Sequence, residues 1–418
     1  MKVTVKQGIR GGAISAIPSK SDAHRLLICA ALADAPTTLI CPATSEDIEA
    51  TAGVLRALGA KIQRTEQSYV VTPIKDLPVH ALLDCGESGS TLRFLLPVAA
   101  GLSANATFVG RGRLPQRPMD ELYEALTKKG ACITNGCKLP FDLSGSLSAG
   151  EYEIGGSVSS QYLSGLLMGL PLLAAESRVS VKGILESKGY VLMTLEALSR
   201  FGVDIKREEN RFTVAGGRPY KSPGTITVQG DWSNSAFFFC LGALIPEGVT
   251  VTGLSEGSAQ ADKAVLAVLE EMGAQIERLE NAITVKKGSL RGVTVDAADI
   301  PDLVPVLSIV GAQAEGKTTF INAGRLRAKE SDRIKTVCQM ISSLGGFAQE
   351  HEDGLAVWGG LRGGEVDGAG DHRIVMAASV AAALCPVTVT GAQAVCKSYP
   401  AFFEDLSLLG AQIIKEED

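Results

Sequence analysis

The stretch VLAVLEEMGA, Val265–Ala274, decides how this chain is organised, because its pattern recurs. Val265, Val268 and Met272 fall on one face of a helix with 3.6 residues per turn. Gly273 follows them, and glycine ends helices readily because it adopts the left-handed conformation without strain. The stretch therefore predicts an amphipathic helix that stops at a glycine, and an alternating strand is expected after it.

The same pattern, a helix followed by a glycine and a strand, occurs six times along the chain. Its glycines are Gly59, Gly130, Gly202, Gly273, Gly345 and Gly410. They are spaced 71, 72, 71, 72 and 65 residues apart, so six units of about 70 residues account for all 418 residues. A repeat of this length indicates one supersecondary unit per copy.

A second, more apolar helix also recurs about once per unit. Its copies begin near Ser21, Gly89, Ser159, Trp232, Ile300 and Asp371. Helices that are apolar on nearly every side are expected to be buried. Their starts carry polar capping residues, which leave backbone N–H groups at the first turn. Because a helix N-terminus carries about half a positive charge, several such starts brought together would suit an anion.

The composition excludes several classes of protein. The chain has 40 Lys and Arg against 46 Asp and Glu, a net charge of −6, and no stripe of basic and aromatic residues, which disfavours a nucleic-acid coat. No uninterrupted apolar run reaches about 18 residues, and the N-terminus lacks a secretory stretch. Nine scattered cysteines indicate reduced thiols in the cytoplasm. Cys132 and Cys137 lack a second ligand pair, so no metal site is expected.

Cations gather at the ends of the expected elements, which in an acidic chain indicates a focused anion site. Arginine forks match carboxylate and phosphate oxygens, and lysine supplies a point charge or a proton. The residues concerned are Lys20, Arg25, Arg93, Arg117, Arg325, Arg327, Lys329, Arg333, His372, Arg373 and Lys397.

Two carboxylates stand in the same contexts. Asp302 follows Pro301 at a buried helix start, and Glu330 lies in the basic run RLRAKESDR. A carboxylate among cations stays ionised and can act as a base, whereas one in a drier place can act as an acid. The alternatives are that Asp302 caps a helix and that Glu330 and Asp332 complement a helix dipole. No nucleophile elbow, Walker loop, dinucleotide fingerprint or paired metal-binding histidine appears.

Eight motifs, taken together, resemble those of the 5-enolpyruvylshikimate-3-phosphate (EPSP) synthase family, and they cover all six units in order. They are PSKSDAHR from Pro18, CGESGSTLRF from Cys85, RPM from Arg117, SSQYLSGLLM from Ser159, PDLVP from Pro301, RLRAKESDRI from Arg325, GDHRIVMA from Gly370 and CKSYPAFFEDL from Cys396.

The resemblance implies an α/β (α+β) fold: a two-domain inside-out αβ barrel of six βαβαββ repeats, three per domain. One domain would comprise residues 1–18 and 230–418 and would form the phosphoenolpyruvate side of an interdomain cleft. The other, residues 19–229, would form the shikimate 3-phosphate side. The implied enzyme moves the enolpyruvyl group of phosphoenolpyruvate to the 5-hydroxyl of shikimate 3-phosphate through a tetrahedral intermediate, releasing phosphate. This reaction belongs to chorismate and aromatic amino-acid biosynthesis.

The resemblance also implies that the enzyme uses no cofactor, is a cytoplasmic monomer without nucleic-acid or membrane partners, and is inhibited by glyphosate. Its implied catalytic residues are Asp302, Glu330 and Lys20. Shikimate 3-phosphate would contact Lys20, Ser21, Arg25, Ser159, Ser160, Gln161, Ser187, Tyr190, Asp302 and Lys329. Phosphoenolpyruvate would contact Lys20, Gly89, Arg117, Gln161, Arg333, His372, Arg373 and Lys397, with Arg93 in support.

Two positions depart from the family pattern, and two rival functions compete with the one that the resemblance implies. Glu87 stands in a loop that often reads Asn-Ala-Gly, and Arg325 stands where many members have Asn. The sister enzyme that acts on UDP-N-acetylglucosamine usually carries a loop cysteine, yet none lies between Cys85 and Cys132. A six-unit clamp that only binds partners would keep its contact residues similar across copies, whereas these copies differ in their charged residues.

Overall fold

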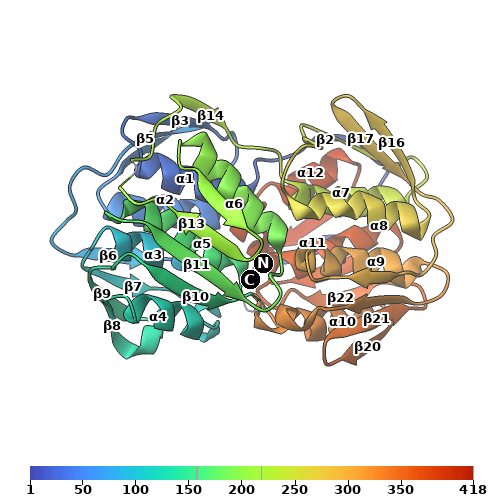
Figure 1. Ribbon diagram of the computed structural model, residues 1–418. Helices are drawn as coiled ribbons and strands as arrows, with labels where there is room; N and C mark the ends of the chain where they lie inside the picture. The colour runs from blue at the N-terminus through green and yellow to red at the C-terminus, as the bar shows by residue number, and fades with distance from the viewer. Residues whose placement is uncertain (157–158, 218, 418) are drawn as a thin grey trace. The chain divides into compact units, whose positions relative to one another are not determined.

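The computed structural model describes residues 1–156, 159–217 and 219–417, and it confirms a mixed α/β fold built from helices and small sheets. In this part of the chain the strands form six four-stranded sheets. The chain divides into two compact units. Unit 1 comprises Met1–Ser19 and Gln229–Asp418, and unit 2 comprises Lys20–Val228. In Figure 1, unit 2 runs from blue to green and most of unit 1 from yellow to red.

Two sheets of unit 2 share one plan, in which the first two strands are parallel and the rest antiparallel. One has the order β6 (Ala81–Asp84), β7 (Ala106–Val109), β9 (Phe141–Gly145) and β8 (Ala131–Ile133). The other has the order β10 (Glu151–Gly155), β11 (Ser177–Lys182), β13 (Arg211–Val214) and β12 (Ile205–Glu208).

The third sheet of unit 2 joins the two ends of that unit's sequence. Its order is β14 (Thr225–Thr227), β3 (Thr37–Ile40), β5 (Ser68–Thr72) and β4 (Lys61–Arg64). Strand β14 pairs parallel with β3, in the register Thr225 to Thr38. The last strand of the unit therefore supplies the parallel partner that β6 and β10 supply in the other two sheets.

Unit 1 repeats this plan, with strands contributed by both ends of the chain. One sheet has the order β18 (Thr294–Asp296), β19 (Thr318–Ile321), β21 (Gly354–Trp358) and β20 (Phe347–His351). The next has β16 (Gln275–Leu279), β17 (Ala282–Lys286), β15 (Val249–Thr252) and β2 (Gly12–Ser15). The last has β22 (Gly364–Asp367), β23 (Val387–Thr390), β1 (Lys2–Val5) and β24 (Ile413–Glu416). Strand β1 is antiparallel to both neighbours, so Lys2 faces Thr390 on one side and Glu416 on the other.

The two predicted kinds of helix are confirmed. The apolar, largely buried helices are α1 (Lys20–Ala31), α3 (Gly89–Gly101), α5 (Ser160–Gly169), α7 (Trp232–Leu244), α9 (Val304–Gln313) and α11 (His372–Val380). The amphipathic helices are α2 (Glu46–Ala57), α4 (Asp120–Thr127), α6 (Lys188–Arg200), α8 (Val265–Met272), α10 (Arg333–Ser343) and α12 (Phe402–Leu408).

Short 3₁₀ helices join these elements. They are η1 (Leu114–Gln116), η2 (Thr134–Cys137), η3 (Leu170–Leu172), η4 (Ala261–Ala264), η5 (Pro301–Leu303), η6 (Gly324–Ala328), η7 (Ala381–Ala383) and η8 (Ala392–Lys397). All six repeat glycines have positive φ, and Gly273 caps α8 with φ of 101°. The glycine stop is thus confirmed in every copy.

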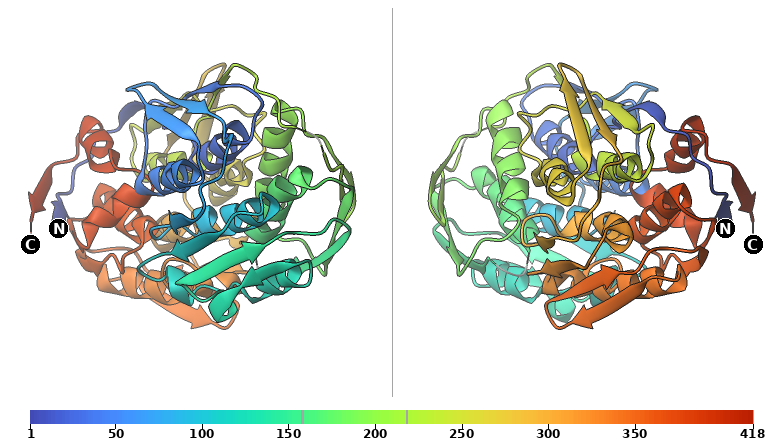
Figure 2. Two further views of the ribbon diagram at one scale, coloured as in Figure 1. Left: turned by 90° about the vertical axis from the view of Figure 1, so that its left-hand side faces the viewer. Right: turned by 90° about the vertical axis from the view of Figure 1, so that its right-hand side faces the viewer.

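Each unit has its own apolar core. In unit 1 the helices α7, α9 and α11 pack on one another, and in unit 2 α3 packs on α5. Figure 2 shows unit 1 in its right-hand panel, where strands such as β16 and β20 lie outside the helices. No helix among the described residues has both the length and the apolar character to span a membrane.

Candidate active site

Three helix starts of unit 1 meet around Arg373. Arg373, the second residue of α11, donates from Nη2 to Ser233 Oγ at 2.8 Å, and Ser233 is the second residue of α7. The same Nη2 lies 3.0 Å from Asp302 Oδ2, and Nη1 donates to the Asp302 carbonyl oxygen at 3.3 Å. Asp302 lies in η5, directly before α9. The apolar helices of this unit therefore bring their N-terminal ends together, an arrangement that suits an anion.

Arg333 joins the carboxylates of this region. Its side chain is only 1% exposed, and it donates to Asp302 Oδ1 at 2.7 Å and to Glu330 Oε2 at 2.8 Å. It also makes two bonds to Asp371, at 2.8 and 3.2 Å. Burial alone would lower the pKa of Arg333, but Asp371, Glu330 and Asp302 outweigh it and raise the pKa. Arg333 is therefore firmly charged.

Asp302 is the carboxylate with the most cationic neighbours in this cluster. Lys329 Nζ lies 3.6 Å from Asp302 Oδ1, in addition to the contacts of Arg333 and Arg373. Burial alone would raise the pKa of Asp302, but Arg373, Lys329 and Arg333 hold it well below its ordinary value. Burial lowers the pKa of Lys329 to about 8. At neutral pH Asp302 is thus ionised. Lys329 is mostly charged at this pH, but it loses its proton at a lower pH than an ordinary lysine does.

Two further predicted residues lie at the same helix start. His372 begins α11, is 2% exposed, and has Nδ1 4.0 Å from Asp371 Oδ1. Lys397 Nζ donates to the carbonyl oxygen of Gly370 at 2.7 Å. By contrast, Arg327 bonds Glu350 at 2.7 Å at an exposed position. Arg325 donates to the carbonyl oxygen of Ala298.

A second group of predicted residues forms in unit 2 at the starts of α3 and α5. Gly89 begins α3, and a Cβ there would lie only 2.6 Å from Arg117 Nη1. Gln161 accepts from Arg93 Nη1 at 2.8 Å and donates to Ser90 Oγ at 2.9 Å. The position of the Arg117 guanidinium therefore requires a residue without a side chain at 89.

The serines predicted to hold a phosphate lie at helix starts of the same unit. Ser159 caps α5 by accepting from the backbone N–H of Gln161 at 3.3 Å, and Ser160 is the first residue of that helix. Ser187 precedes α6 and has φ of 52°, which is unusual for a residue with a side chain.

Arg25 ties α1 to α6. It is 1% exposed, and its Nε donates to Thr194 Oγ1 at 2.8 Å. Its Nη1 donates to the Ser21 carbonyl at 2.6 Å and its Nη2 to the Tyr190 carbonyl at 2.9 Å. Burial lowers the pKa of Arg25 to about 10, so Arg25 remains charged at neutral pH.

Lys20 and Glu87 complete the predicted residues of unit 2. Lys20 Nζ forms an ion pair with Asp47 Oδ2 at 2.8 Å, with both side chains largely buried. The Glu87 carboxylate lies directly against Gly112, because a Cβ added to Gly112 would overlap it. The loop around Gly112 therefore accommodates the acidic residue that departs from the family pattern.

Sequence reasoning missed several residues that contact the predicted ones. They are Asp47, Thr194, Ser233 and Asp371. Asp371 carried a signal, since it directly precedes His372 and Arg373, but an aspartate before a helix indicates only a cap. Ser233 carried none, because its contact with Arg373 joins elements far apart in the sequence.

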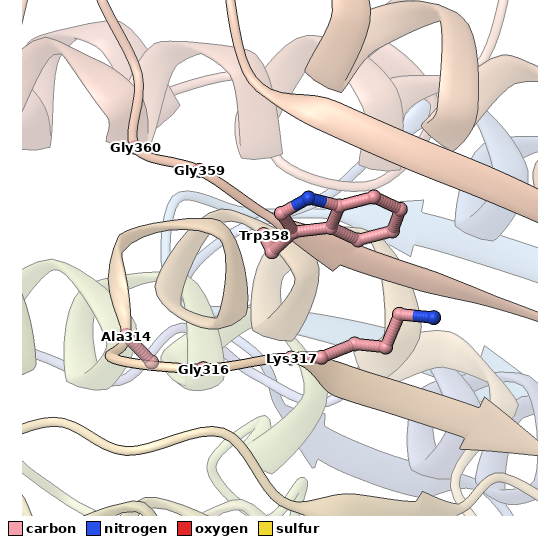
Figure 3. A pocket seen from close by; sticks show the side chains of 6 residues that line it. All are labelled: Ala314, Gly316, Lys317, Trp358, Gly359 and Gly360. Atoms are coloured by element: carbon pink, nitrogen blue, oxygen red, sulfur yellow. The ribbon is translucent and has the colours of Figure 1, made fainter.

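A pocket on unit 1 contains none of the predicted site residues. It is lined by Ala314, Gly316, Lys317, Trp358, Gly359 and Gly360 (Figure 3). Lys317 Nζ lies 4.8 Å from the centre of the Trp358 ring and donates to Gln349 at 3.3 Å. The cation of this pocket is therefore already engaged, and the cluster around Asp302 is the better candidate for chemistry.

A family model described as EPSP synthase (3-phosphoshikimate 1-carboxyvinyltransferase) matches residues 6–406, which include every predicted site residue. The chain belongs to the EPSP synthase family. Similar EPSP synthase relatives include the 3-phosphoshikimate 1-carboxyvinyltransferase of Clostridium kluyveri, 40% identical over 96% of each chain. That of Clostridium perfringens is 39% identical over the full length of both chains. The family indicated by the sequence motifs is therefore confirmed.

Solved structures agree with this membership. The EPSP synthase of Acinetobacter baumannii has a TM-score of 0.82 at 25% identity and covers 99% of this chain and 100% of its own. The enolpyruvyl transferase NikO of Streptomyces tendae shares the fold, with a TM-score of 0.80 at 19% identity over 99% of this chain and 98% of its own.

Proposed function

We propose that this protein transfers the enolpyruvyl group of phosphoenolpyruvate to the 5-hydroxyl of shikimate 3-phosphate and releases phosphate. The observation that carries the proposal is the cluster in unit 1, where Arg333, Arg373 and Lys329 surround Asp302. Membership of the EPSP synthase family supports the same reaction. Two polyanions react only where fixed cations offset their mutual repulsion, and this cluster supplies such cations.

The substrate contacts are assigned from the resemblance to the family, and the charges of the residues support them. The phosphoenolpyruvate carboxylate and phosphate need arginine forks and compact cations, and the 3-phosphate needs hydroxyl donors at a helix start. We assign phosphoenolpyruvate to Lys20, Gly89, Arg117, Gln161, Arg333, His372, Arg373 and Lys397. We assign shikimate 3-phosphate to Lys20, Ser21, Arg25, Ser159, Ser160, Gln161, Ser187, Tyr190, Asp302 and Lys329.

The low pKa of Asp302 is compatible with its role as a base, provided that substrate binding raises this pKa. When the anionic substrates bind, they attract Arg373, Lys329 and Arg333, and the pKa of Asp302 rises toward that of a useful base. The 5-hydroxyl oxygen then bonds to C2 of phosphoenolpyruvate and gives its proton to Asp302, while Glu330 protonates C3. In the second step phosphate leaves C2 with the proton that Asp302 holds, and C3 returns its proton to Glu330. Lys20 assists the proton transfers.

Finer features of the fold and cellular setting belong to the same proposal. We assign each group of three sheets to three βαβαββ repeats of an inside-out barrel. Unit 1 supplies the phosphoenolpyruvate side and unit 2 the shikimate 3-phosphate side. The enzyme is expected to be a cytoplasmic monomer, which fractionation and sedimentation would test.

The decisive experiment measures phosphate release from phosphoenolpyruvate, with shikimate 3-phosphate and with UDP-N-acetylglucosamine in turn. Only the first acceptor should support turnover, and glyphosate should compete with phosphoenolpyruvate. Asp302→Asn and Glu330→Gln should each lower kcat by about 10²–10⁴-fold. Glu315→Gln, an exposed carboxylate of unit 1, is the matched control and should leave kcat unchanged. Near-normal rates in both cluster variants would contradict the assignment.

A further inference from the structure

Arg25 is the most buried of the cations assigned to shikimate 3-phosphate, and three hydrogen bonds hold it. Its Nε donates to Thr194 Oγ1 at 2.8 Å, its Nη1 to the Ser21 carbonyl oxygen at 2.6 Å and its Nη2 to the Tyr190 carbonyl oxygen at 2.9 Å. The guanidinium also lies over the ring of Phe94, with Cζ 4.8 Å from the ring centre. The ring therefore fixes the plane of the guanidinium, and the three bonds fix its rotation within that plane.

These three bonds leave part of the guanidinium for a ligand. An arginine carries five N–H groups, one on Nε and two on each terminal nitrogen. Within the described part of the chain Arg25 uses one N–H of each nitrogen, so one on Nη1 and one on Nη2 remain. Two N–H groups on the two terminal nitrogens match the two oxygens of a carboxylate. Because unpaired donors on a buried cation are costly, this pair favours an anionic acceptor.

Of the three acceptors, Thr194 alone contributes a side chain, and the direction of its bonds is determined. Arginine has no acceptor atom, so Thr194 Oγ1 must turn a lone pair toward Nε. Its own proton points elsewhere, toward Ser164 Oγ at 2.8 Å and the Tyr190 carbonyl oxygen at 3.0 Å. The side chains of Thr194 and Ser164 are fully buried, so bulk solvent does not compete for these bonds.

This chain of bonds joins three helices that carry assigned substrate contacts. Arg25 belongs to α1, Ser164 to α5 and Thr194 to α6. Helix α6 packs on both α1 and α5. Ser160 begins α5 and Ser187 directly precedes α6, and both are assigned to the phosphate of the substrate. The Thr194 hydroxyl therefore ties the guanidinium of Arg25 to the two helices that present these serines.

We propose that Thr194 is a positioning residue for the binding of shikimate 3-phosphate: its hydroxyl fixes the Arg25 guanidinium so that the two remaining N–H groups meet the carboxylate of this substrate. The inference rests on the proposed function. Thr194 acts only through Arg25 and does not touch the substrate. Without the acceptor at Thr194, the buried Nε–H must seek another one, and the guanidinium turns away from the carboxylate.

The test measures by calorimetry how the enzyme binds shikimate 3-phosphate and the methyl ester of its carboxyl group, which lacks the negative charge there. Thr194→Val keeps the side-chain volume and removes the acceptor. It should weaken binding of shikimate 3-phosphate about tenfold, the loss of one hydrogen bond to a charged group, and leave affinity for the ester unchanged. Thr194→Ser keeps the hydroxyl and should restore wild-type affinity. Equal weakening for both ligands would show a merely structural role and overturn the proposal.

Thr127→Val is the matched control. Thr127 Oγ1 donates to the carbonyl oxygen of Tyr123 at 2.8 Å, the same bond across one helical turn that Thr194 makes with Tyr190. No arginine of the described residues donates to Thr127, so this variant should change affinity for neither ligand. If Thr194→Val fails to fold by circular dichroism, Thr194→Cys decides, because sulfur is a weak acceptor. A wild-type ratio of the two affinities in that variant overturns the proposal.

The failure of this inference is distinguishable from failure of the proposed function. If the wild type releases phosphate with shikimate 3-phosphate while Thr194→Val binds both ligands as the wild type does, Thr194 has no positioning role and the function stands. If the wild type binds shikimate 3-phosphate without turnover, the function fails and calorimetry still decides the role of Thr194. If the wild type does not bind shikimate 3-phosphate at all, both fail.

Discussion

Position 89 must be a glycine, because the guanidinium of Arg117 occupies the space that a side chain would need. Because a Cβ on Gly89 would lie 2.6 Å from Arg117 Nη1, Gly89→Ala must displace the guanidinium. We expect KM for phosphoenolpyruvate to rise about tenfold, the loss of one charge-assisted hydrogen bond, with little change in KM for shikimate 3-phosphate. Steady-state kinetics with each substrate varied in turn would measure this.

Gly53→Ala is the control for Gly89→Ala. Gly53 lies inside α2, and a Cβ there meets nothing within 4 Å. Alanine should leave both KM values unchanged and stabilise the helix by about 0.5–1 kcal/mol. Equal KM values in the Gly89 and Gly53 variants would show that Arg117 does not bind phosphoenolpyruvate.

His24 gives a prediction about acid stability. It is fully buried, and its Nδ1 lies 2.7 Å from Thr51 Oγ1. Burial, assisted by Lys20 and Arg25, holds the pKa of His24 well below its ordinary value of 6.5. Below pH 6.5 the unfolded chain therefore binds a proton that the folded chain refuses, so acidification favours unfolding by up to about 1.4 kcal/mol per pH unit.

Urea unfolding of His24→Gln between pH 7.5 and 5.5 measures this contribution. The variant should show a smaller loss of unfolding free energy across that range than the wild type does. His80→Gln is the control, because His80 is exposed and bonds Thr107 Oγ1 at 2.9 Å. An identical pH dependence in the His24 variant and the wild type would refute the assignment.

The sequence predicted many individual site residues because they lie in short motifs at helix starts. Lys329, Glu330 and Arg333 are neighbours in the chain and are neighbours in the cluster. The residues that support them were not predictable in this way. Ser233 contacts Arg373 only because α7 and α11 pack together, and no local pattern records such packing.

Among the elements, the glycine that ends α8 allows a test of whether this helix end requires glycine. Gly273 has φ of 101°, and a Cβ there would overlap the carbonyl oxygen of Ser289. Gly183 also has positive φ, at 74°, but a Cβ there meets nothing. Gly183→Ala should therefore lower the unfolding free energy by the conformational strain alone, about 1–2 kcal/mol, and Gly273→Ala by distinctly more.

Chemical denaturation of these two variants checks the prediction. If Gly183→Ala proves as destabilising as Gly273→Ala, the chain relieves the overlap between the alanine Cβ at position 273 and Ser289 without loss of unfolding free energy. The overlap would then not explain the glycine.

Helices were more predictable than sheets at this scale. The apolar period of α8 and α10 extends over two or more turns, so type and position followed from the sequence. Most strands contain only three to five residues, and their pairing depends on distant partners. Nothing in Thr225–Thr227 indicates that it pairs with Thr37–Ile40.

For the whole molecule, the sheet that joins the two ends of the chain should control the stability of unit 1. Val3 and Val5 are fully buried in β1, between β23 and β24. Replacing both with alanine removes four buried methyl groups and should lower the unfolding free energy by about 3 kcal/mol or more. Lys2→Ala, which removes an exposed ion pair with Glu365, should change it by less than about 1 kcal/mol.

Hydrogen exchange would locate the effect of the double variant. Amides of β22 to β24 and α11 should exchange faster, while those of α3 and α5 in unit 2 keep their protection. Uniform acceleration in both units would show that the molecule unfolds as one cooperative body instead.

The position of β1 and β2 also constrains how the protein is made. These strands precede all the other described strands in the sequence, yet their sheet partners β15, β23 and β24 lie more than 230 residues further along the chain. At about 5–20 residues per second, Lys2–Val5 is synthesised roughly 20–80 s before Ile413–Glu416. All of unit 2 is translated in that interval. The nascent chain therefore carries β1 without its sheet partners until β23 and β24 have been synthesised.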